Sequence, residues 1–164
     1  MTRYLLPLVL LLFVAACDTG DPMGDEIRRV IITEVEIEAA PLVRSNGDDW
    51  DGGILGFERP DIYFDLVNAD TGGNAFSTFD DDFSDVDNDD FPLVWVFDPG
   101  IQFTIFTAPL AFQIWDADDN DDDFMGMTNS FTIQQLIDQG APVLFTIQSA
   151  DGSISVRIRL EYSR

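Results

Sequence analysis

Strict alternation of apolar and polar residues is the feature that most restricts the fold of this chain. It is clearest in SISVRIRLEY, residues 153–162, where every second residue from Ile154 to Leu160 is apolar and the residues between them are Ser or Arg. A period of two is typical of a β-strand that buries one face, because successive side chains of a strand point to opposite sides of a sheet. The segment RVIITEVEIEAA, residues 29–40, has the same character, with apolar residues at Val30, Ile32, Val35 and Ile37.

Further β-rich runs follow at short spacing, separated by loops rich in Gly, Asp and Pro. They are PDIYFDLVN (60–68), FPLVWVF (91–97), IQFTIF (101–106), LAFQIWD (110–116) and PVLFTIQS (142–149). Only FTIQQLIDQG, residues 131–140, favours a short helical turn, near residues 132–139. This pattern predicts an all-β fold, an antiparallel β-sandwich of seven or eight strands in a single domain.

The N-terminus has the character of an export signal. Residues 1–16 hold one Arg, a short apolar run and then small residues, and they are followed by the single Cys of the chain, Cys17. The ending VAAC resembles a bacterial lipobox, which implies a lipid-modified Cys17 at the start of the mature chain. We therefore expect a signal peptide at 1–16, a flexible tether at 17–29, a folded domain at 30–164, and membrane anchoring in the bacterial cell envelope, on the periplasmic or outer-membrane face.

The charge of the chain excludes several functions. The chain has 31 Asp and Glu residues but only eight basic residues, all Arg, so its formal net charge is −23. A nucleic-acid partner is excluded because phosphates require a basic surface. Without His and with one Cys, His-based acid–base chemistry, Cys–His catalysis and ordinary zinc sites are excluded as well. No catalytic or cofactor fingerprint is present, so we expect a protein that is not an enzyme.

The acidic residues gather in loops, above all in IWDADDNDDDFMG, residues 114–126. Asp116 and Asp118 are separated by one residue. In an extended strand such residues point to the same side, so both carboxylates can face one ion. Ca²⁺ binds six to eight oxygen atoms, and carboxylates are among its preferred ligands. The sequence therefore predicts a calcium site at this loop.

Four segments carry a resemblance to a known family. QIWDADDNDDDFMGMTNSFTIQQL, residues 113–136, resembles the third loop of a C2 domain, the calcium- and lipid-binding β-sandwich of protein kinase C and synaptotagmin. Asp116, Asp118 and Asp123 fill the acidic positions of that pattern, with Asp122 as an alternative to Asp123. ERPDIYFDL, residues 58–66, is similar to the exit of the first loop of the family, which implies a ligand role for Asp61.

The resemblance extends over most of residues 30–162 and implies an eight-stranded Greek-key sandwich. FPLVWVF is similar to a family segment through Pro92 and Trp95, and GSISVRIRLEY to its last strand. A further acid of the first loop should precede Asp61, and Asp49 or Asp51 can fill that position. Asp51 is preferred because it lies between Trp50 and Gly52, at an expected turn.

The C2 resemblance implies a calcium-binding module without catalytic activity, and the resemblance of VAAC to a lipobox implies that this module is anchored at the cell surface through Cys17. Its expected partners are phospholipid head groups or an envelope protein, with apolar residues Ile54, Leu55 and Phe57 at the loop tip. The alternative is a structural envelope lipoprotein of a halophile, because Asp-rich surfaces without Lys stay soluble at high salt, and such a protein needs no specific ion site.

Two weaker alternatives remain. An EF-hand-like loop at residues 116–127 would also bind calcium, but Asp121 stands where that loop requires Gly, and Met127 where it requires Glu. A carbohydrate-binding sandwich would use exposed Trp side chains as a platform.

Overall fold

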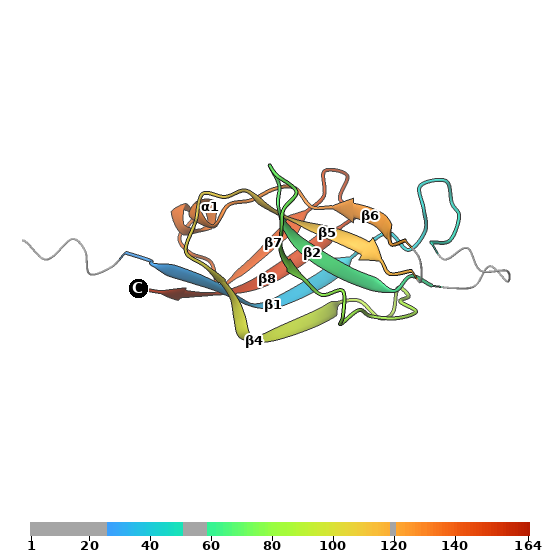
Figure 1. Cartoon of the computed structure of the whole chain (residues 1–164), viewed down its shortest axis with the longest axis horizontal. Helices are drawn as coiled ribbons and strands as arrows, with labels where there is room; N and C mark the ends of the chain where they lie inside the picture. The colour runs from blue at the N-terminus through green and yellow to red at the C-terminus, as the bar shows by residue number, and fades with distance from the viewer. Residues whose placement is uncertain (1–25, 51–58, 119–120) are drawn as a thin grey trace, which may run out of the picture.

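The computed structural model describes residues 26–50, 59–118 and 121–164. Within these residues the chain forms two antiparallel sheets of four strands each, which enclose a common hydrophobic core (Figure 1). The predicted β-sandwich is thus confirmed at the level of two packed antiparallel sheets. In the described part of the chain no helix is long and apolar enough to span a bilayer.

The first sheet has the strand order β4-β1-β8-β7. Its strands are β1 (Arg29–Ala39), β4 (Leu93–Phe103), β7 (Leu144–Gln148) and β8 (Ser155–Ser163). The second sheet has the order β3-β2-β5-β6. Its strands are β2 (Ile62–Asn68), β3 (Asn74–Ser77), β5 (Leu110–Asp116) and β6 (Asp123–Met127).

The alternating residues of the sequence form the inner face of the first sheet. On β8, Val156, Ile158 and Leu160 are buried, and on β1 the buried positions run from Val30 and Ile32 to Val35 and Ile37. The step of three between Ile32 and Val35 coincides with a β-bulge, where the pairing of β1 with both neighbours shifts. A bulge adds one residue to a strand, so the apolar residues on both sides of it still face the core.

The predicted runs 91–97 and 101–106 are not two strands. The structure joins them into the single edge strand β4, which passes through Asp98, Pro99 and Gly100. Pro lacks an N–H group and is tolerated on an edge strand, where one side of the backbone has no neighbouring strand to bond.

Residues 131–140 contain the short helix α1 (Ile133–Asp138), which lies within the predicted segment. It begins with a capping box: the Thr132 hydroxyl accepts from the Gln135 N–H, at 3.1 Å, and the Gln135 side chain accepts from the Thr132 N–H, at 2.8 Å. Ile133 and Leu136 are buried and attach the helix to the core.

Candidate metal centre

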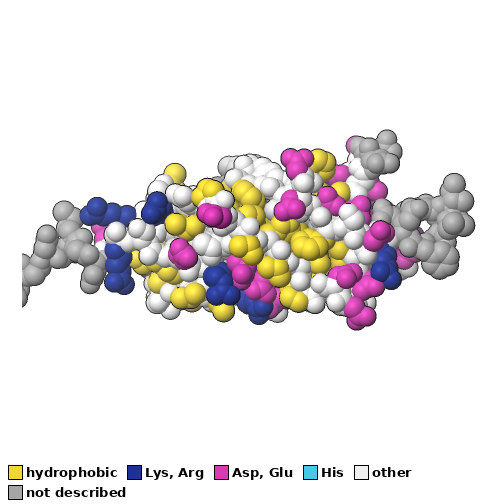
Figure 2. All heavy atoms as spheres, turned by 90° about the horizontal axis from the view of Figure 1, so that it is seen from below, with side chains coloured by type: hydrophobic (Ala, Val, Ile, Leu, Met, Phe, Trp, Pro, Cys, Tyr) yellow, Lys and Arg dark blue, Asp and Glu magenta, His cyan; other side chains and the backbone are white. Residues whose placement is uncertain are grey.

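The acid-rich loop between β5 and β6 lies at the end of the sandwich opposite to the C-terminus (Figure 1). The start of β2 and the segment 40–50, which follows β1, lie at the same end (Figure 1). On the face seen in Figure 2, acidic side chains are also more frequent toward this end. Strand connections thus bring acidic residues from distant parts of the sequence to one region.

Three carboxylates of this loop converge. Asp116 ends β5 and Asp123 begins β6, and the two residues face each other in the register of these strands. Asp118 follows β5 by two residues. One carboxylate oxygen from each of the three lies within 4.8 Å of the others. We call Asp116, Asp118 and Asp123 the Asp cluster.

Asp116 is the most buried member of the Asp cluster, with no exposed surface. Its Oδ1 accepts a hydrogen bond from the backbone N–H of Asp61, at 2.7 Å, and the Ala117 N–H donates to the Asp61 carbonyl, at 2.8 Å. A buried carboxylate is tolerated only when hydrogen bonds or counter-charges compensate for its lost hydration. The backbone of Asp61, directly before β2, therefore fixes the position of this side chain.

Asp61 itself lies beside the Asp cluster but outside it. Its Oδ1 accepts from the backbone N–H of Asp85, at 2.7 Å. Burial raises the pKa of this carboxyl group, the Asp85 N–H opposes the rise, and the charges of Asp82, Asp85 and Asp118 add to it. The structure thus places the Asp61 backbone next to the Asp116 carboxylate, while the Asp61 carboxylate accepts from the loop that contains Asp85.

Asp122, the alternative to Asp123, has other partners. Its Oδ2 accepts from the Tyr63 hydroxyl, at 2.7 Å, and its Oδ1 from the backbone N–H of Asp118, at 3.1 Å. Burial, and then the bond to Asp122, raise the pKa of Tyr63 well above its usual range. Both oxygens of Asp122 therefore hold the loop in shape.

Sequence reasoning missed a cation at this site. Arg44, in the segment after β1, forms a salt bridge through Nη2 with Oδ2 of Asp123. The same nitrogen donates to the carbonyl of Trp50, at 2.6 Å, and the guanidinium lies 5.3 Å from the centroid of the Trp50 ring. No sequence signal connects Arg44 with Asp123, because 79 positions separate them and only the fold brings them together.

Several predicted positions lie outside the described residues. They are Cys17, Asp51, and the loop-tip residues Ile54, Leu55 and Phe57. Asp49, the alternative to Asp51, is described and forms an isolated bridge with Val43.

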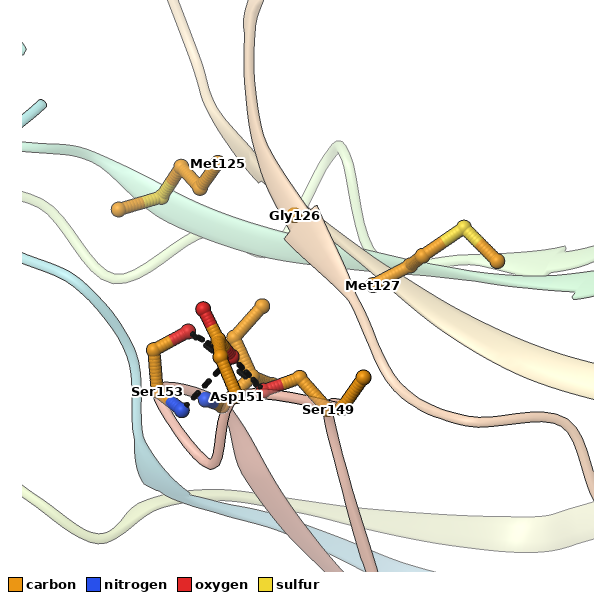
Figure 3. Close-up of a pocket in the computed structure, with 8 residues that line it drawn as sticks. Met125, Gly126, Met127, Ser149, Asp151 and Ser153 are labelled. Atoms are coloured by element: carbon orange, nitrogen blue, oxygen red, sulfur yellow. Dashed lines mark hydrogen bonds between the residues drawn. The ribbon is translucent and has the colours of Figure 1, made fainter. Parts of the chain in front are cut away.

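A separate pocket of about 330 Å³ lies beside β6, between Met125, Gly126 and Met127 and the turn 149–153 (Figure 3). The Asp151 carboxylate at its edge accepts from the hydroxyl groups of Ser149, at 2.6 Å, and Ser153, at 2.8 Å (Figure 3). These bonds lower the pKa of Asp151 to about 2. The Asp151 carboxylate thus stabilises the turn 149–153 to which it belongs. The Asp cluster is therefore the stronger candidate for a functional site.

Comparisons with known proteins bear on the fold. No family model matches the chain, and no curated protein sequence matches it. Among solved structures, the chain is similar to part of human GIVD cytosolic phospholipase A2, a structure in complex with the inhibitor methyl γ-linolenyl fluorophosphonate and terbium chloride. The TM-score is 0.50 and the identity 19%, over 84% of this chain and 18% of the phospholipase chain. This chain therefore spans less than one fifth of that protein, and the similarity concerns the fold alone.

Proposed function

We propose that this protein is a non-catalytic, calcium-binding C2-like module. The observation that carries the proposal is the convergence of three carboxylate oxygens within 4.8 Å of one another. Asp116 and Asp123 supply two of them from the facing ends of β5 and β6, and Asp118 supplies the third from the residues after β5. Ca²⁺ binds oxygen at about 2.3–2.6 Å, so two oxygens bound to one ion are separated by at most about 5 Å. The spacing in the Asp cluster fits this limit.

The surrounding residues support a site that is partly built before the ion arrives. The Asp61 N–H orients Asp116, and Asp122 holds the loop through Tyr63 and the backbone of Asp118. Asp123, which pairs with Arg44, would exchange that partner for the ion. Asp61 becomes an additional ligand if its carboxylate leaves the Asp85 N–H, and Asp51 remains part of the proposed set.

We further propose that the module is anchored in the bacterial envelope through a lipid on Cys17. Strand β1 begins at the end of the sandwich opposite to the Asp cluster (Figure 1). A tether that leads from the membrane into β1 would therefore direct the Asp cluster away from the anchor. In that arrangement calcium mediates contact with phospholipid head groups or an envelope protein beyond the anchoring surface.

The similar phospholipase structure was obtained with terbium chloride. Tb³⁺ is a hard cation that favours oxygen ligands, as Ca²⁺ does, and nearby Trp side chains sensitise its luminescence. Trp115 precedes Asp116 directly. Tb³⁺ is thus a suitable probe for this chain, in competition with Ca²⁺.

The test is calorimetry and thermal melting of the protein with Ca²⁺, and with Mg²⁺ and Na⁺ at equal ionic strength. Calcium that binds only the folded state stabilises it by about 2.7 kcal/mol at a hundredfold excess over Kd. We expect selective stabilisation by Ca²⁺ that Asp116→Asn with Asp118→Asn abolishes. The matched control is Asp80→Asn with Asp81→Asn, which removes two charges from the neighbouring acidic loop, residues 79–91, and should preserve calcium binding.

The halophile alternative predicts a different result. If acidic residues serve only solubility at high salt, then stability follows ionic strength whichever cation supplies it. A melting temperature that responds equally to Na⁺ and Ca²⁺ at matched ionic strength would contradict the calcium proposal.

A further inference from the structure

Arg44 is held firmly beside the Asp cluster. Its backbone N–H donates to the Asp48 carbonyl, at 2.8 Å, and its own carbonyl accepts from the Gly47 N–H, at 2.9 Å. Its guanidinium lies against Trp50, whose indole N–H donates to the Pro41 carbonyl, at 2.7 Å. The segment 41–50 is thus closed on itself and presents this cation to Asp123.

We propose that Arg44 is a built-in counter-cation that competes with a divalent metal ion for the Asp cluster and thereby sets its affinity. This inference rests on the proposed function. It goes beyond that function by naming the residue that regulates the site and the partner exchange that accompanies binding.

The competition follows from the contacts. Oδ2 of Asp123 accepts from the Arg44 guanidinium. A carboxylate that is already paired with a guanidinium binds a metal ion less strongly, because the metal must compete with that ion pair. A divalent ion within the Asp cluster would also repel the adjacent guanidinium, since both are positive. Metal binding and the Arg44–Asp123 salt bridge therefore oppose each other, and an ion in the Asp cluster favours withdrawal of Arg44 from Asp123.

The same contacts explain what Arg44 does without metal. Three carboxylates within 4.8 Å repel one another, and the guanidinium offsets part of that repulsion. Because Arg44 also bonds to the Trp50 carbonyl and lies on its ring, its withdrawal changes the surroundings of Trp50. Metal binding is thus coupled to the segment 41–50.

The experiment compares Ca²⁺ titrations of the wild-type protein and Arg44→Gln, by calorimetry and by Tb³⁺ luminescence. An exposed or half-exposed ion pair contributes up to about 1 kcal/mol, so removal of the competitor should tighten the Ca²⁺ Kd roughly threefold to fivefold. Arg44→Gln should also lower the melting temperature of the metal-free protein. Arg44→Lys, a point charge without the planar guanidinium, should give an intermediate Kd.

The matched control is Arg59→Gln. Arg59 pairs with Asp87 in the neighbouring acidic loop, at 2.6 Å. This change therefore also removes one positive charge, but the carboxylate that loses its partner is outside the Asp cluster. Its Kd should stay within about twofold of the wild-type value, because screening weakens the effect of more distant exposed charges. An equal gain in both variants would overturn a specific role for Arg44 and leave only general electrostatics.

A second readout follows the partner exchange. With Trp95 and Trp115 replaced by Phe, the emission of Trp50 should change on addition of Ca²⁺, and this change should shrink in Arg44→Gln. If the wild-type protein binds Ca²⁺ and Arg44→Gln binds equally or more weakly, the inference is wrong while the proposed function stands. If neither protein binds Ca²⁺, both fail.

Discussion

Asp122 and Asp123 are adjacent in the sequence, but their carboxylates have different partners. The Asp122 carboxylate accepts from Tyr63 and from the Asp118 backbone, whereas that of Asp123 lies in the Asp cluster and pairs with Arg44. Consecutive residues at the start of a strand point to opposite sides, which separates the two environments. One of these acids shapes the loop, and the other is available to a cation.

Asp151 provides a prediction about pH. Its carboxylate accepts from Ser149 and Ser153, and these bonds lower its pKa to about 2. A folded-state pKa below the unfolded value of about 3.9 means that the charged form stabilises the fold above the unfolded pKa. This contribution should disappear as the pH falls from about 4 to 2. The stability deficit of Asp151→Asn, measured by urea denaturation, should therefore be largest near neutral pH and shrink over this range.

The carboxyl NMR titration of Asp151 gives a direct check. Its midpoint should be near 2 in the wild-type protein and should move upward in Ser153→Ala, which removes one of the donors. A wild-type midpoint near 4 would disprove the assignment.

At the residue scale, part of the candidate site could be predicted from sequence. The alternate spacing of Asp116 and Asp118 was enough to place them together, and the C2 resemblance added Asp61 and Asp123. The bond from Asp61 to the Asp85 N–H, and the salt bridge from Arg44, could not be foreseen. Both depend on how loops far apart in sequence fold against each other, and no periodicity records that.

At the scale of strands, burial decides how much the sequence reveals. The alternation of apolar and polar residues predicts the long strands β1 and β8, because each buries one face in the core. Strand β3 was not, because its four residues are mostly exposed and carry no apolar pattern. The sequence predicts two strands in the region of β4, because Asp98, Pro99 and Gly100 favour a turn. In the structure, the residues on both sides of this tripeptide pair with β1, so the two runs form one strand.

Gly100 provides a prediction at this scale. A Cβ atom at this position would lie 2.5 Å from Cγ2 of Ile31 and 2.6 Å from the carbonyl oxygen of Ile32. Both atoms belong to the central part of the sheet, so β4 would have to move away from β1. Gly100→Ala should therefore cost about 1–3 kcal/mol of unfolding free energy, measured by urea denaturation.

The control for Gly100 is Gly73→Ala, in the loop between β2 and β3. Its Cβ would approach only the Thr71 hydroxyl, at 3.3 Å, and the residue is exposed. The expected change is about 0.5 kcal/mol or less. Equal losses in both variants would show that the close approach of β4 to β1 is not the cause.

At the scale of the whole molecule, charge and core are arranged separately. On the outer face of the first sheet, Arg157 pairs with Glu36 and Glu38, and Arg159 pairs with Glu34. The acids of the Asp cluster lie instead at one end, where Arg44 is the basic partner that the described contacts supply. The sandwich thus pairs acidic with basic side chains along the outer face of its first sheet and gathers three acids with one described basic partner at the proposed calcium site.

Phe64 joins the two sheets and provides the last prediction. This fully buried side chain of β2 makes an edge-to-face contact with Trp95 of β4, at 5.1 Å between ring centroids, and another with Phe112 of β5, at 5.4 Å. Phe64→Ala should leave a cavity between the sheets and cost about 3–5 kcal/mol, a large part of a typical stability of roughly 5–15 kcal/mol. Chemical denaturation measures this loss. The half-exposed Phe79 is the control, and Phe79→Ala should cost about 1 kcal/mol or less. Similar costs for both changes would mean that the aromatic contacts of Phe64 do not hold the sheets together.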